Sequence, residues 1–196
     1  MTPEPSDKAA ADVSYAYKAS LIGAAHRFEL TIDGLRWHIG GKSGVWPYAG
    51  ISAVRLSYRP VSMQSHRFRA DIDGAGLGHI VVLSTSWQTA ALMAPQDNDY
   101  RTFITQLHAR MAAAGSGAVL IGGLRPGIYA AAVALLTLVA MAMIGLLVRA
   151  VATGEFAGIL FLVGFAALFG WQVGGFVRRN RPQAYSFGGL PAALLP

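Results

Sequence analysis

Two apolar stretches decide the fold, and they read GIYAAAVALLTLVAMAMIGLLV at residues 127–148 and FAGILFLVGFAALFGWQVGGFV at residues 156–177. Each has 22 residues and contains no Asp, Glu, Lys, Arg or His. A helix rises about 1.5 Å per residue, so each stretch reaches roughly 33 Å, enough to cross a hydrocarbon core of about 30 Å. The seven residues between them allow only a short turn. The sequence therefore predicts a transmembrane α-hairpin over residues 126–178.

Charges at the ends of the hairpin predict its orientation. The turn holds Arg149 opposed by Glu155, whereas arginines are the only charged residues next to the outer ends. These outer arginines are Arg125, Arg178, Arg179 and Arg181. Cytoplasmic flanks of membrane spans carry an excess of Lys and Arg. We therefore expect a multi-pass membrane protein with both termini in the cytoplasm and the turn outside.

The rest of the composition excludes several classes of function. A chain of 196 residues has room for one ordinary domain beside the hairpin. The pI of about 10.0 reflects mainly the arginines that flank the hairpin, so nucleic-acid binding is not expected. The chain has no cysteine, which excludes disulfides, thiolate metal sites and a thiol nucleophile. Residues 1–14 are polar and lack an apolar core, which predicts a disordered lead rather than a signal peptide.

Alternation of apolar and polar side chains predicts a β domain over residues 15–115. Residues 28–32 alternate strictly, and Asp33-Gly34 is a dipeptide favoured in two-residue hairpin turns. Further strand-like stretches occur at residues 35–39, 45–48, 51–59, 66–71 and 80–84, with loops expected over residues 40–44 and 73–78. Six or seven short strands at about ten-residue spacing are typical of an antiparallel sandwich or small barrel.

The pattern becomes helical after Asp97 and Asp99, which are favourable residues at a helix N-terminus. Apolar side chains then recur at helical spacing and form one stripe, made of Tyr100, Phe103, Ile104, Leu107 and Met111. Gly115 ends the pattern, as glycine commonly does after a helix. We expect an amphipathic helix that covers the strands, then a linker over residues 116–125 and, after the hairpin, a cytoplasmic tail over residues 179–196.

One segment resembles a known family. DGLRWHIGGKSGVWPYAGISAVRL, residues 33–56, looks like the middle of bacterial pleckstrin-homology-like (PH-like) domains found beside membrane spans. In those domains an aromatic strand leads through a polar loop into a Tyr/Trp-x-x-Ile-x-x-Val pattern, here Tyr48, Ile51 and Val54. The resemblance covers roughly residues 15–114, and it implies a protein of a bacterial cytoplasmic (inner) membrane. It implies an α+β protein with a PH-like antiparallel barrel closed by a C-terminal helix, which binds lipid headgroups, peptides or proteins and rarely catalyses.

The chain departs from the lipid-binding members of that family at one place. Those members carry a Lys-x(n)-Lys/Arg-x-Arg pattern across the first hairpin. Lys18 and Arg27 match its first two positions, but Glu29 occupies the third. Because a carboxylate there would repel a phosphate, the resemblance does not extend to phosphoinositide recognition.

A set of four arginines is the main candidate for lipid or partner binding. They alternate along two neighbouring predicted strands and are Arg55, Arg59, Arg67 and Arg69. Paired in register, these strands would place four guanidinium groups on one face, and such a face attracts anionic lipid headgroups. The alternative is an ordinary solvated face, paired with Glu29, Asp71 and Asp73.

No catalytic residue, metal site or cofactor is predicted. The histidines are His26, His38, His66, His79 and His108, and none of them has the spacing of a metal-binding motif. The sequence contains no Gly-x-Ser-x-Gly motif, and residues 40–44 lack the spacing of a phosphate-binding loop.

Small residues in the hairpin are candidates for helix packing. Ala130 and Ala134 lie four residues apart in the first stretch, as do Gly170 and Gly174 in the second. Such pairs allow close helix approach in lipid. They serve either to pack the hairpin on itself or to dock a second copy or another membrane protein.

The sequence thus predicts a membrane-anchored, non-enzymatic binding or scaffold protein that presents a PH-like domain at the cytoplasmic membrane face. Its expected partners are membrane lipids and a membrane or cytoplasmic protein, and a homo-oligomer is allowed. The alternative is a small accessory subunit of a membrane enzyme or transporter complex, docked through the glycine-rich hairpin.

Overall fold

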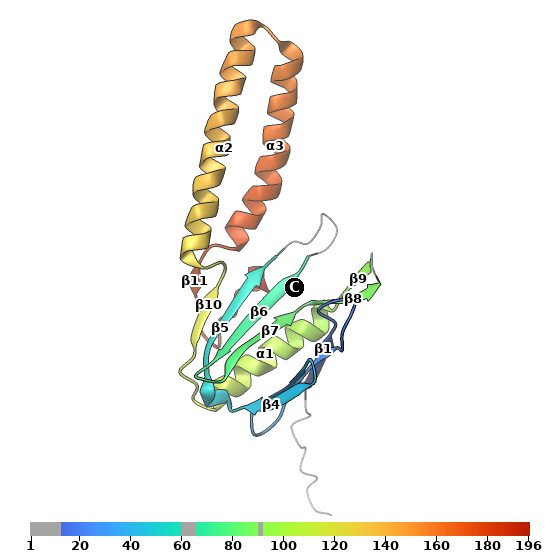
Figure 1. Ribbon diagram of the computed structural model, residues 1–196. Helices are drawn as coiled ribbons and strands as arrows, with labels where there is room; N and C mark the ends of the chain where they lie inside the picture. Colours follow the sequence, from blue (N-terminus) through green and yellow to red (C-terminus); the bar gives the residue numbers. More distant parts are fainter. Residues whose placement is uncertain (1–12, 60–65, 90–91) are drawn as a thin grey trace, which may run out of the picture.

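The computed structural model describes residues 13–59, 66–89 and 92–196. The chain is an α+β protein in which two long helices project as a hairpin from one end of a β domain (Figure 1). These helices, α2 (Pro126–Thr153) and α3 (Phe156–Arg179), are long and apolar enough to cross a membrane. The two apolar stretches lie within α2 and α3, which agrees with the predicted hairpin. Helix α2 continues beyond residue 148 to Thr153, where Gly154 adopts a left-handed conformation and ends it.

Four strands form the first sheet in simple antiparallel order, and they are β1 (Val13–Tyr17), β2 (His26–Leu30), β3 (Leu35–Ile39) and β4 (Lys42–Trp46). The expected loop over residues 40–44 is shorter in the structure. Gly40 and Gly41 have φ angles of 56° and 79°, which allow a tight two-residue turn, so β4 already begins at Lys42. Val13 and Ser14 belong to β1 rather than to the expected lead, and residues 1–12 lie outside the described residues.

The second sheet contains β5 (Ile51–Tyr58), β6 (Phe68–Gly74) and β7 (Gly78–Leu83), which a 3-10 turn, η1 (Tyr48–Gly50), joins to the first sheet. β10 (Val119–Gly122) pairs in parallel with β5, and β11 (Gln183–Ala184) pairs with β10. The linker predicted over residues 116–125 therefore contains a strand of this sheet. The pairing satisfies backbone groups of β5 that would otherwise form an open sheet edge.

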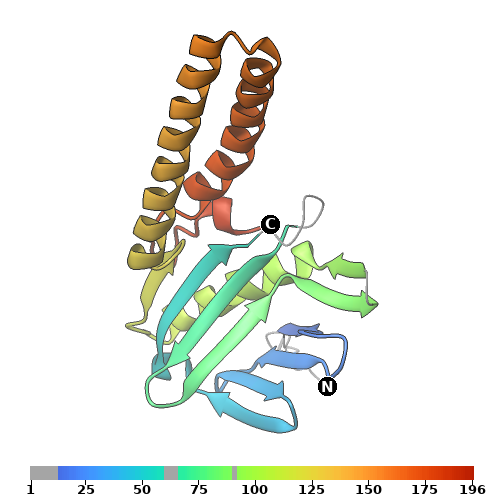
Figure 2. The same ribbon diagram turned by 45° about the horizontal axis from the view of Figure 1, so that its top comes forward.

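Helix α1 (Asp97–Ala113) covers the core between the two sheets (Figure 2). The five apolar residues of its predicted stripe are all fully buried, which confirms the amphipathic helix. A hairpin of β8 (Thr85–Thr89) and β9 (Leu92–Pro95) precedes α1. The sequence analysis did not predict this hairpin, whose polar and apolar residues lack a strict alternation.

Two tyrosine side chains connect the sheets where the backbone does not. The Tyr15 hydroxyl donates to the Leu83 carbonyl at 2.6 Å, and the Tyr17 hydroxyl donates to the Val81 carbonyl at 2.7 Å. Both acceptors lie on β7, the last strand of the second sheet. β1 is thereby fixed beside β7, and the two sheets enclose a common core.

The tail after the hairpin is part of the β domain. Leu194, in the 3-10 turn η2 (Ala192–Leu194), is fully buried in the core, and Tyr185, Phe187 and Leu190 pack against that core. The Tyr185 hydroxyl donates to Nε2 of the buried His108 at 2.9 Å, while Nδ1–H of His108 donates to the Ile104 carbonyl at 2.7 Å. The tail therefore lies on α1, where it completes the packing of the helix.

Because His108 is buried, we expect the folded protein to lose stability in acid. Burial lowers the pKa of His108, although its bond to the Ile104 carbonyl opposes this shift. Below the ordinary histidine pKa of about 6.5, the unfolded chain takes up a proton on His108 that the folded chain does not. The free energy of unfolding therefore decreases as the pH is lowered, by up to about 1.4 kcal/mol per pH unit. Thermal melts from pH 8 to pH 5 should show this loss, and His108→Gln should reduce its slope. An unchanged slope in the variant would contradict the prediction.

Candidate functional site

Asn180, the residue after α3, ties the hairpin to the second sheet. Its side-chain Oδ1 accepts a hydrogen bond from the Tyr58 N–H at 3.0 Å, and its carbonyl accepts one from the Leu124 N–H at 3.0 Å. The side chain also donates to the Phe176 carbonyl at 3.2 Å, and the residue is fully buried. The end of β5 and both ends of the hairpin therefore meet at one asparagine.

Gly123 allows the backbone that enters α2 to lie directly against the backbone that leaves α3. Its N–H donates to the Leu56 carbonyl at 2.8 Å, and its φ of 86° is left-handed. A Cβ at this position would lie 2.4 Å from the Arg181 carbonyl oxygen and 2.5 Å from that of Asn180. Only glycine fits there, because the chain entering the hairpin lies directly against the chain leaving it. The β domain is thus attached to the hairpin through a packed junction rather than a free linker.

A cavity of about 510 Å³ opens beside this junction, and we call it the foot cavity. Its lining residues come from the last turn of α3, the C-terminal tail and the beginnings of β6 and α1. Its polar lining comes from His66, Asp97, Arg178 and Arg179, and its apolar lining from Phe68, Ala192, Ala193, Leu195 and Pro196. No local sequence signal predicted it, because the lining residues come from four separate parts of the chain.

The two arginines of the foot cavity retain positive charge for a ligand. Neither Arg178 nor Arg179 forms an ion pair with another described residue. The guanidinium of Arg179 lies over the Tyr58 ring, 5.0 Å from its centroid, an arrangement that favours a cation. Arg178 and Arg179 were predicted to set the topology of the hairpin, together with Arg125 and Arg181, and all four are exposed at its foot.

The four candidate arginines of the sheet share one face, as expected. Arg55 lies opposite Asp71 and Ser57 lies opposite Arg69 in the β5–β6 register, while the Arg59 N–H donates to the Arg67 carbonyl. The apolar residues that alternate with these arginines are buried on the opposite face, namely Val54, Leu56, Tyr58 and Phe68.

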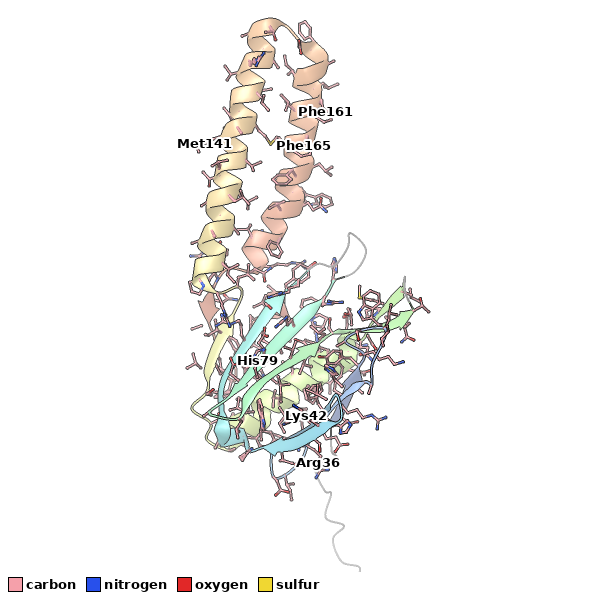
Figure 3. The ribbon with its side chains drawn as sticks, viewed as in Figure 1. Arg36, Lys42, His79, Met141, Phe161 and Phe165 are labelled. Carbon is pink, nitrogen blue, oxygen red and sulfur yellow. The ribbon has the colours of Figure 1, made fainter. Side chains whose placement is uncertain are left out.

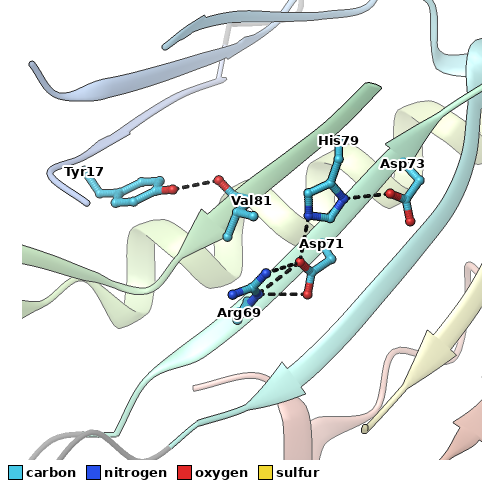
Figure 4. A network of polar contacts seen from close by, with 6 residues as sticks. All are labelled: Tyr17, Arg69, Asp71, Asp73, His79 and Val81. Carbon is cyan, nitrogen blue, oxygen red and sulfur yellow. Dashed lines mark hydrogen bonds and ion pairs between the residues drawn. The ribbon is translucent and has the colours of Figure 1, made fainter. Parts of the chain in front are cut away.

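Two of these four guanidinium groups are already bound within the chain. Arg69 Nε donates to both oxygens of Asp71 at 3.0 and 2.9 Å, and this hydrogen bonding raises the pKa of Arg69 (Figure 4). Arg67 donates to Thr85 Oγ1 at 2.9 Å and to Met93 Sδ at 2.8 Å, and partial burial lowers its pKa. Arg59 is exposed, and Arg55 is half-buried. The predicted patch is therefore weaker than four free cations.

His79 extends this pairing across the same face, which the sequence analysis did not foresee. Its Nε2 lies 3.1 Å from Asp71 Oδ1, and its Nδ1 lies 2.6 Å from Asp73 Oδ1 (Figure 4). The direct pairing of Asp73 with His79 in the β6–β7 register would have predicted it, had the register been known. Among the described residues, neither Arg55 nor Arg59 forms an ion pair, so two of the four predicted cations of this face are not neutralised by a carboxylate.

The outer face of the first sheet lies far from the hairpin, as Arg36 and Lys42 show in Figure 3. Arg36 forms an ion pair with Glu29 at 3.1 Å, so Glu29 does not compensate the arginines of the second sheet. A smaller cavity of about 250 Å³ lies beside this pair. Within the described residues, no group of three His, Cys, Asp or Glu side chains is arranged to hold a metal ion.

The four small residues of the hairpin do not pack α2 against α3. All four are exposed, namely Ala130, Ala134, Gly170 and Gly174, and no atom lies within 4 Å of a Cβ built at either glycine. Apolar side chains also cover the outside of both helices, including Met141, Phe161 and Phe165 (Figure 3). Any packing through these small residues must therefore be with another helix or with lipid.

Comparison with known proteins identifies no relative. No protein family matches this chain, and no curated protein or solved structure is significantly similar to it. Its function is therefore inferred from its own residues.

Proposed function

We propose that this chain is a membrane-anchored, non-enzymatic binding protein that holds a PH-like domain at the cytoplasmic face of a bacterial inner membrane. The order of elements supports a PH-like fold. A four-stranded antiparallel sheet is followed by the three strands β5 to β7 and then by a helix that covers the core. The hairpin β8–β9, the strands β10 and β11, and the tail are additions to that plan.

The junction at Asn180 and Gly123 is the observation that carries this proposal. A domain on a free tether samples many orientations, whereas this domain is attached by buried hydrogen bonds to both ends of the hairpin. The hairpin therefore fixes which end of the sheet lies near the bilayer. That end carries the exposed Arg59 and the arginines of the foot cavity. Such an arrangement suits a module that binds at the membrane surface.

The two ends of the hairpin differ in charge, since the foot carries only arginines and the turn carries one arginine and one glutamate. Arg125, Arg178 and Arg181 are at the foot, and Arg149 and Glu155 are near the turn. Tyr129 in α2 and Trp171 in α3 lie toward the foot end, where such amphipathic rings favour the membrane interface. These features support a cytoplasmic β domain.

Thiol labelling tests this topology, because the natural chain has no cysteine. Gln106 on α1 and Ala152 near the turn are both exposed, so each tolerates replacement by cysteine. In intact spheroplasts, a membrane-impermeant maleimide should label Ala152→Cys and not Gln106→Cys. After detergent is added, both variants should be labelled equally, which is the control for access. Labelling of Gln106→Cys in intact spheroplasts would overturn the proposal.

One observation favours a second function, that of an accessory subunit in a membrane complex. Gly164, Gly170 and Gly174 of α3 have open space where a side chain would be, so the helix offers close approach to a partner helix. Lipid alone does not require such a surface. In that case the hairpin would bind the partner, and the β domain would set its orientation.

A further inference from the structure

The foot cavity combines positive charge with an apolar wall. Arg178 and Arg179 supply two guanidinium groups, and Asp97 supplies the one carboxylate side chain among its described lining residues. Phe68 and Leu195 contribute to the apolar part of the lining. A volume of about 510 Å³ lies within the range of natural small-molecule sites. The lining therefore suits a ligand that has both an anionic and an apolar part.

The position of the foot cavity along the hairpin indicates where such a ligand comes from. Arg178 directly follows the uncharged stretch of residues 156–177, which is about 33 Å long as a helix and so exceeds a hydrocarbon core of about 30 Å by only a few Å. The headgroup layer beyond the hydrocarbon is about 5–8 Å thick on each side. With α3 crossing the bilayer, the foot cavity lies at the depth of the lipid headgroups.

We propose that the foot cavity binds the phosphate group of an anionic phospholipid, with Arg178 and Arg179 as its ligands. This inference rests on the proposed function, because it requires the hairpin to span the membrane. Guanidinium groups bind phosphate through paired charge-assisted hydrogen bonds. Contact with the Tyr58 ring already orients Arg179, which reduces the entropy lost on binding. The apolar lining contacts the glycerol and the first acyl carbons.

Two arginines of the second sheet, Arg67 and Arg69, fit this ligand less well. Arg69 is neutralised by Asp71, and Arg67 is held by Thr85 and Met93. The Arg36–Glu29 ion pair joins β3 to β2 in the first sheet and lies away from the foot of the membrane hairpin. Inorganic phosphate would use the same two arginines but would leave the apolar lining of the cavity without a contact. The structure thus favours a lipid over a free phosphate.

Native mass spectrometry of the full chain in a non-ionic detergent tests this site. The probes are phosphatidylglycerol and phosphatidylcholine with identical acyl chains. The wild type should retain one phosphatidylglycerol in preference to phosphatidylcholine, and Arg178→Gln with Arg179→Gln should weaken this retention roughly 5–30-fold. The matched control is Arg125→Gln with Arg181→Gln, which removes the same charge at the same end of the hairpin but outside the cavity lining. This control should retain the lipid.

A second variant keeps the test decisive if the arginine variant does not fold. Ala193 lines the cavity and is exposed, so Ala193→Phe should fill the space without changing the charge. It should also abolish lipid retention. An undiminished preference in Ala193→Phe would overturn the site, as would an equal loss in both double-arginine variants, which would indicate diffuse surface attraction.

The source of the phosphate is tested by competition. Excess inorganic phosphate should not displace phosphatidylglycerol from the wild type. Displacement would assign the arginines to a free phosphate and overturn the lipid proposal. Either failure would leave the thiol-labelling result unchanged, so loss of this inference is distinguishable from loss of the proposed function.

Discussion

Replacing Gly123 by alanine is expected to separate the hairpin from the β domain. A left-handed conformation costs a residue with a Cβ about 1–2 kcal/mol, and overpacking typically costs a further 1–3 kcal/mol. Here the new Cβ would lie 2.4 Å from the Arg181 carbonyl oxygen, and backbone cannot move aside as a flexible side chain can. Separation would also leave the buried Tyr58 N–H without its acceptor on Asn180.

The measurement is thermal unfolding of the full chain in detergent, followed by near-ultraviolet circular dichroism of the buried aromatic residues. Gly123→Ala should lower the melting temperature by roughly 5–15 °C, at about 2–4 °C per kcal/mol for a chain of this size. Gly127→Ala is the matched control, because nothing lies within 4 Å of a Cβ at that glycine. Equal melting of the two variants would show that the junction is looser than the packing at Gly123 implies.

Leu194→Ala is expected to destabilise the β domain by about 2–5 kcal/mol, the usual cost of truncating a buried leucine. Leu194 lies in the C-terminal tail but is fully buried in the core, where it contacts the strand β10 at Gly122. The variant leaves a void between η2 and β10. A tail that merely rested on the membrane surface would lose far less.

Chemical denaturation in detergent, followed by the same aromatic signal, measures this loss. Leu135→Ala makes the same chemical change on the outside of α2, where the side chain is 63% exposed. It should leave the stability of the β domain nearly unchanged. A loss below 1 kcal/mol in Leu194→Ala would be incompatible with a buried tail.

Elements with a strong local pattern could be predicted from the sequence. The stripe from Tyr100 to Met111 is the buried face of α1. A turn does occur at Asp33-Gly34, but the expected two-residue form was wrong. Leu30 of β2 pairs with Leu35 of β3, so the turn spans residues 31–34, where Thr31 donates to the Gly34 carbonyl. The hairpin follows from apolar length alone, since two 22-residue stretches without charge occur beside a short turn. These features depend on neighbours within about ten residues, so the sequence contains the whole of the relevant information.

The candidate site was predictable only in part. Alternation placed Arg55, Arg59, Arg67 and Arg69 on one face, and the β5–β6 register agrees with that arrangement. The pairing of Arg69 with Asp71 was expected only as an alternative, and the engagement of Arg67 by β8 and β9 was not foreseen. The reason is that polarity reports which face a residue occupies but not which partner the next strand places beside it.

The sequence by itself determined the kinds of element and their order, because hydrophobic periodicity and turn chemistry act locally. The tertiary structure decided the rest. β10 pairs with β5 across more than sixty residues, and Leu194 fills the core from beyond the hairpin. Asn180 joins three segments, and the foot cavity exists only where they meet. Hydrophobic periodicity in the sequence predicts that a side chain is buried. Which residues it packs against depends on the tertiary structure.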